Sequence, residues 1–168
     1  MSDKQLVMAF FADEDTADAA VKELKQWDKD SKDVKLGAIG VLVKNDKGKI
    51  KTHKVGKRKT ALGAILFALV GVLSGGLTVI GGALFGGIIG SFFHKGLGMS
   101  KEDLAKIDGD LDDGKAAVAA LVEPEEGDVV AAKLADLGGE PQAYTVTEEA
   151  VDHAEEAAED APEEEPAE

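Results

Sequence analysis

The chain has 168 residues, of which 44% are hydrophobic and only 5% aromatic, which predicts one domain with an aliphatic core and some appendages. There is no cysteine, which excludes disulfides, thiolate metal sites and a cysteine nucleophile. The formal net charge of -14 is unevenly spread, because residues 148–168 carry 11 acidic side chains and no Lys or Arg. The remaining 22 acidic and 19 basic residues form a nearly neutral body.

Apolar periodicity predicts strands at 5–12, 35–44 and 49–56 in the first 60 residues, with a helix at 16–27 after the first strand. Asp13 or Asp15 is positioned to cap this helix. The N-terminus shows no basic region followed by a long apolar one, so no secretory signal is expected.

Residues 96–147 predict helices at 100–111 and 125–137 and strands at 116–123 and 142–146. Ser100 and Asp103 have the spacing of a capping box. Together with residues 1–60, this order predicts an α+β fold, a ferredoxin-like two-layer sandwich of sheet and helices.

An uncharged run separates the two halves of this domain. It covers 33 residues from Ala61 to Phe93 and ends at His94 and Lys95. One transmembrane helix needs about 20 residues, and a single span would place the two halves on opposite sides of a bilayer. We therefore expect residues 61–95 to form a glycine-zipper hydrophobic helical hairpin that turns near residues 74–76.

Small residues recur at helical spacing along this hairpin, which lets helix backbones approach closely in apolar surroundings. The predicted membrane-binding and self-association residues are Gly71, Gly75, Gly82, Gly86 and Gly90. The favoured interpretation is a re-entrant hairpin inserted in a membrane. A hairpin buried in a soluble oligomer, a single tilted span and an ordinary core hairpin are the alternatives.

Residues 44–59 carry eight Lys or Arg against one acid. Basic residues on both sides of the uncharged run indicate that both ends stay cytoplasmic, in contact with anionic headgroups. The predicted lipid-contacting residues are Lys54, Lys57, Arg58, Lys59 and Lys95. The alternative is a solvated edge strand protected by lysines.

Few residues are suited to catalysis. The three histidines, His53, His94 and His153, lack a second His at ligand spacing, so no metal or cofactor is expected. Residues 108–113 resemble a calcium loop with a misplaced glycine, and a helix-ending turn is the favoured interpretation. There is no phosphate-binding loop, and the basic segment lacks the interleaved aromatic residues of nucleic-acid sites. No enzyme activity, nucleic-acid partner or small-molecule substrate is predicted.

Three segments around the glycine-rich insert carry a family resemblance: Gly98–Leu111, Gly114–Glu123 and Gly138–Val146. They resemble the bacterial domain of unknown function 1269 family, described as predicted membrane proteins, and the likeness covers about residues 4–147. The resemblance implies a ferredoxin-like body, membrane association and no known catalysis. It implies no catalytic residues.

The sequence therefore favours a membrane-associated, self-assembling protein that binds lipids and its own copies, with its α/β domain on the cytoplasmic side. A soluble homo-oligomeric particle with inward-packed hairpins and a ligand-binding ferredoxin-like domain are the alternatives.

Residues 148–168 are rich in Glu, Ala and Pro and are expected to form a disordered acidic tail, with a partial helix over 149–158 as the alternative. The tail either competes with lipid headgroups for the basic residues or keeps the protein soluble.

Overall fold

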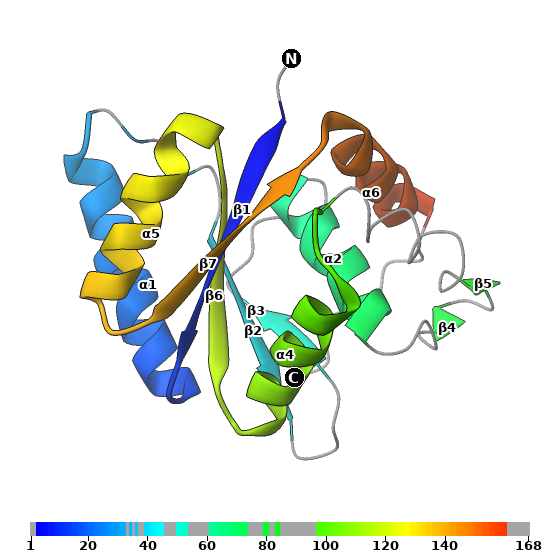
Figure 1. Ribbon diagram of the computed structural model, residues 1–168, viewed down its shortest axis with the longest axis horizontal. Helices are drawn as coiled ribbons and strands as arrows, with labels where there is room; N and C mark the ends of the chain where they lie inside the picture. The colour runs from blue at the N-terminus through cyan, green and yellow to red at the C-terminus, as the bar shows by residue number, and fades with distance from the viewer. Residues whose placement is uncertain are drawn as a thin grey trace.

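The computed structural model describes residues 3–32, 34, 36, 39–45, 50–53, 61–73, 79–80, 83–84 and 97–160. Within these residues the protein is α+β, with a five-stranded antiparallel sheet and helices on either side of it (Figure 1). The strands of this sheet are β1 (Lys4–Phe11), β2 (Ile39–Lys44), β3 (Ile50–His53), β6 (Ala116–Val122) and β7 (Glu140–Val146). The helices are α1 (Glu14–Asp30), α2 (Ala61–Leu73), α4 (Lys101–Asp112), α5 (Gly127–Asp136) and α6 (Glu148–Asp160), and a 3-10 turn, η1 (Pro124–Glu126), precedes α5.

The five strands lie in the order β3-β2-β6-β1-β7. Strand β6 is central, and β1 lies between β6 and β7, with Val7 opposite Ala120 of β6 on one side and Ala143 of β7 on the other. Strands β6 and β7 come after the uncharged run in the sequence, and both pair with β1, which comes before it. The strands before the uncharged run (β1, β2 and β3) and the strands after it (β6 and β7) therefore form one sheet.

Both faces of the sheet are covered. On one face Val7, Ala9 and Phe11 of β1 pack with residues of α1 and α5. On the other face Leu6 and Met8 pack with residues of α2, α4 and α6. Figure 1 shows these layers edge-on, with α1 and α5 to the left of the sheet. The sheet with α1 and α5 forms the expected two layers, and the remaining helices add a third.

The predicted helix caps at Asp13 and Ser100 are confirmed. Asp13 caps α1 by accepting hydrogen bonds from the Thr16 side chain at 2.6 Å and the Thr16 backbone N–H at 2.7 Å, and these bonds lower the pKa of Asp13. Ser100 and Asp103 exchange side-chain-to-backbone bonds in a capping box that opens α4. Both caps satisfy N–H groups that a helix leaves without internal partners.

The second arm of the predicted helical hairpin is not helical where it is described. Val79–Ile80 (β4) and Ala83–Leu84 (β5) form a separate two-stranded sheet, with Ile80 opposite Ala83. The first arm is helical, as α2, and the rest of the second arm lies outside the described residues.

The prediction of a disordered tail from residue 148 is wrong for residues 148–160, which form α6. Ala150 and Ala154 are buried on one side of α6, while Glu149, Asp152 and Glu156 are exposed, so docking stabilises a helix that the composition alone disfavours. The helix considered over 149–158 is thus observed with slightly wider bounds. Residues 161–168 lie outside the described part.

Replacing glycine by alanine is expected to change the free energy of unfolding in opposite directions at Gly139 and Gly109. A Cβ at Gly139 would lie 2.7 Å from the Phe11 ring and 3.0 Å from the Ala9 Cβ, both buried beside α1 and α5, whereas a Cβ at Gly109 in α4 would meet nothing within 4 Å. We expect Gly139→Ala to lower the free energy of unfolding by about 1–3 kcal/mol, because overpacking forces β1 to shift. Gly109→Ala should raise it by about 0.5–1 kcal/mol, because alanine favours a helix interior. Urea unfolding measures both, and equal effects would contradict this packing.

Candidate functional site

The structure describes the beginning of the predicted membrane-binding segment. Gly71 lies in α2, near the end of that helix. The other predicted site residues lie outside the described residues: Gly75, Gly82, Gly86, Gly90, Lys54, Lys57, Arg58, Lys59 and Lys95. The geometry that bears on this segment therefore comes from α2 and from the elements that pack on it.

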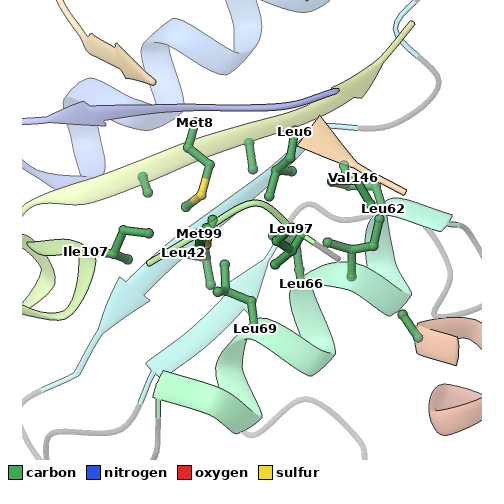
Figure 2. Close-up of a cluster of buried hydrophobic side chains, with 14 of the residues drawn as sticks. Leu6, Met8, Leu42, Leu62, Leu66, Leu69, Leu97, Met99, Ile107 and Val146 are labelled. Carbon is green, nitrogen blue, oxygen red and sulfur yellow. The ribbon is translucent and has the colours of Figure 1, made fainter. Parts of the chain in front are cut away.

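Helix α2 buries one apolar face on the sheet. Figure 2 shows Leu62, Leu66 and Leu69 directed from α2 toward β1 and β2. Ile65 is buried with them, and none of these four side chains is more than 2% exposed. In the described conformation, the start of the uncharged run is therefore a core helix of the α/β body.

The dimensions of α2 bear on the membrane interpretation. Its 13 residues span about 20 Å at about 1.5 Å per residue, which is shorter than the roughly 30 Å of a bilayer's hydrocarbon core. Within the part of the chain that the structure describes, no helix combines the length and the apolar character that crossing a membrane requires.

The side of α2 away from the sheet is also covered. Ala64 follows Leu62 by two residues, about 200° around the helix, yet it is 0% exposed. Helix α6 packs along α2, and its Ala150 and Ala154 join the same buried cluster. Burying a methyl-sized group contributes about 0.8 kcal/mol, so these alanines hold α6 more weakly than the larger side chains hold α2 on the sheet.

The residues that follow the uncharged run pack in the same core cluster as α2. Leu97 and Met99, just after the run, are buried in the cluster that contains Leu62 and Leu66. Figure 2 shows them between α2 and the sheet. The chain thus leaves and re-enters the body on the same face, as a hairpin insert requires.

An ion-pair cluster lies on this same side of the sheet. Lys44 at the end of β2 donates a hydrogen bond to Asp108 at 2.9 Å and another to Asp112, both on α4. The side chain of Lys44 is only 13% exposed. The Asp112 and Asp108 bonds raise the pKa of Lys44 above its ordinary value. The positive charge of Lys44 is thus balanced by carboxylates of α4, although Lys44 belongs to the basic segment.

The basic segment is divided between the two faces of the sheet. In β3, Ile50 packs on the side of α2, so Lys51, one residue later, points to the opposite side. Strand β3 is an edge strand, and a lysine there fits the alternative interpretation of an edge protected by charge.

The calcium-like stretch is a helix end, as the favoured interpretation predicts. Residues 108–112 belong to α4, Asp113 caps it, and Gly114 has a φ of 85° that reverses the chain. Lys115 pairs with Asp110 at 3.6 Å. No group of three or more His, Cys, Asp or Glu side chains among the described residues is arranged to hold a metal ion.

Two other titratable residues stand out. Tyr144 of β7 is half-buried, and burial raises the pKa of its hydroxyl, as do the negative charges of Asp103 and Asp110. It is therefore a neutral phenol in the physiological range. Helix α6 brings Glu149, His153 and Glu156 onto one exposed face, which is a solvated acidic surface.

The sequence analysis missed one pair of residues, Ala150 and Ala154. They show the same four-residue spacing of small side chains that marks Ala64 and Ala68 in the uncharged run. This signal was present in the tail, but the acidic composition around it pointed to disorder.

No family model matches the chain, and neither the curated proteins nor the solved structures contain a match.

The Lys44 cluster predicts a pH-dependent contribution to stability. Replacing Lys44 by Met leaves two carboxylates four residues apart on α4 without their cation, so we expect the free energy of unfolding to fall by about 1 kcal/mol at pH 7. Because folding raises the pKa of Lys44, this difference should be complete below the ordinary lysine pKa of 10.5 and should disappear as the pH rises through the higher folded value. Urea titrations at several pH values measure it.

Lys51→Met is the matched control, since no ion pair of Lys51 with a described residue is present and the same atoms are changed. A loss for Lys51→Met as large as that for Lys44→Met would show that the ion pairs with α4 are not the cause.

Proposed function

We propose that the protein is a non-catalytic, membrane-associated, self-assembling protein that binds lipids and its own copies through residues 61–95. The observation that carries this proposal is the uncharged run of 33 residues, with basic residues on both sides. A run of this length exceeds what one helix needs to cover the second face of the sheet. The surplus beyond α2 is the part proposed to contact a membrane.

The position of the insert supports this proposal. Figure 1 places β4 and β5 at the periphery, away from the five-stranded sheet. They pair with each other and form a sheet of their own. Val79, Ile80 and Leu84 of these strands are apolar residue types, which suit an interface with lipid or with another copy. Lys44 precedes the insert and Asp108 of α4 follows it, so their ion pair links the chain on the two sides of the insert.

The topology supports a ferredoxin-like body as part of the proposal. Without β3, the sheet order is β2-β6-β1-β7, and α1 and α5 follow β1 and β6 on the same face. This order is compatible with the split β-α-β arrangement of a ferredoxin-like body. In this interpretation β3, α2 and α4 are additions that accompany the insert, and the resemblance to the bacterial domain of unknown function 1269 family stays a prediction.

A soluble homo-oligomer is the second candidate, and the burial of α2 favours it. The apolar side chains of α2 are covered by the body itself, with Leu69 and Ile65 both 0% exposed. A chain that buries the start of its apolar run in this way can bury the rest against neighbouring copies. Measuring particle mass without detergent or lipid distinguishes the two, since only the oligomer has a defined lipid-free size.

The lipid-binding proposal predicts that binding depends on the charge of residues 57–59. We expect the wild-type protein to float with vesicles that contain anionic lipid at low salt, and the triple variant Lys57→Glu, Arg58→Glu, Lys59→Glu to bind about 100-fold more weakly. Vesicle flotation over a lipid titration measures both affinities. Wild-type protein that stays a lipid-free monomer would sink the proposal.

Lys22→Glu, Lys25→Glu, Lys29→Glu is the matched control. These three lysines are exposed on α1, which covers the other face of the sheet from α2. The control makes the same change in net charge, so an equal loss of binding by both variants would indicate attraction by overall charge and not a contact at residues 57–59.

The self-association proposal predicts that Gly86→Leu disrupts assembly more than Leu84→Ala. A large side chain at a close backbone contact forces the packed segments apart, whereas trimming Leu84 removes only contact area. Light scattering of the assembled protein gives the mass of each variant. Equal changes in mass would indicate that Gly86 is only a flexible joint.

A further inference from the structure

The strand order makes the five-stranded sheet depend on β6. Of the three strands of this sheet that precede the uncharged run, β2 pairs with β3, but β1 pairs with β6 and β7, which come later in the chain. Strand β6 lies between β1 and β2, and its Ala117 is opposite Phe10 of β1 and Leu42 of β2. Until β6 is present, β1 and β2 therefore belong to no common sheet.

Helix α2 needs this sheet to bury its apolar face. Leu62, Leu66 and Leu69 point toward β1 and β2 (Figure 2), and they belong to one buried cluster with Ala117 and Ala119 of β6. The far side of α2 is covered by α6, which follows β7 in the chain. Neither side of α2 is fully covered before elements that are synthesised after it have been made.

Protein synthesis separates these events in time. The 49 residues from Ser74 to Val122 run from the end of α2 to the end of β6, and they take roughly 2–10 s to synthesise at about 5–20 residues per second. Helix formation takes about 1 μs. Helix α2, which carries no charged residue, therefore spends seconds in a state in which lipid can reach it and the sheet cannot.

Once the body has folded, α2 is difficult to release. The side chains of Leu62, Ile65, Leu66 and Leu69 are at most 2% exposed. Elements packed in a core open with free energies that approach that of global unfolding. A lipid surface that arrives after folding therefore meets molecules in which α2 is rarely uncovered.

We infer that the strand order gives a lipid surface the first access to the uncharged run, during synthesis, and that the folded body later competes with lipid for α2. The inference rests on the membrane part of the proposed function. A lipid surface is the fitting partner because α2 is uncharged and the residues on both sides of the uncharged run are basic. The face of α2 that lipid would contact is the face that the sheet buries.

The order of addition tests this inference on the full-length chain. The protein is made by cell-free translation, and vesicles that contain anionic lipid are added at the start or after synthesis has ended and aggregates have been removed. We expect at least tenfold more of the soluble protein to float with vesicles that were present during synthesis. Some binding remains in the late arm, because the basic residues still attract anionic headgroups. Equal binding in the two arms would overturn the inference.

A variant of β6 tests whether the sheet is the competitor. Val118 is buried in β6 between Ala9 of β1 and Val41 of β2, so Val118→Ala weakens the strand that joins them. With vesicles added late, we expect this variant to bind at least fivefold more than the wild type, because α2 is uncovered more often. The wild-type comparison needs no variant, so it decides the question even if Val118→Ala does not fold.

Val129→Ala is the matched control, since it removes the same atoms from a side chain that is 48% exposed on α5. It should bind like the wild type in both arms. An equal gain in late binding by the two variants, or no gain by Val118→Ala, would show that the sheet does not withhold α2 from lipid and would overturn the inference.

Wild-type behaviour separates this inference from the proposed function. If the wild-type protein binds anionic vesicles to the same extent in both arms, the inference is wrong and the proposed function stands. If it binds them in neither arm, both are wrong.

Discussion

The structure depends on covering the second face of its sheet. Strand alternation in β1 sends Leu6 and Met8 to one side and Val7 and Ala9 to the other, so both faces of this interior strand are apolar. Helices α1 and α5 can cover only one of them. The other needs an apolar helix, and α2 supplies it from the start of the uncharged run. The insert is therefore joined to the body by the same interaction that completes the core.

This arrangement gives one segment two physical environments. At its beginning, the leucines of α2 are buried on the sheet, and after the run Leu97 and Met99 return to the same cluster. Between them, β4 and β5 lie away from the sheet. The body therefore holds both ends of the segment on the same buried cluster.

Charge is distributed so that it limits what the apolar segment can contact. The carboxylates of α4 neutralise Lys44, and the acidic face of α6 lies outside α2. In the proposed function, the basic residues next to the uncharged run in the sequence contact an anionic surface, and the negative charge on α6 opposes such a contact on its own side.

The sequence by itself determined the types of the regular elements of the body, because strand alternation, helical spacing and the caps at Asp13 and Ser100 are local signals. It also determined that the uncharged run is exceptional, but apolar character reports that a segment avoids water, not what covers it. Only the tertiary structure decided that α2 is a core helix and that residues 148–160 dock on it. The tail escaped sequence reasoning because its buried contacts are alanine methyls, whose weak apolar signal is outweighed by the surrounding carboxylates until α2 is present to receive them.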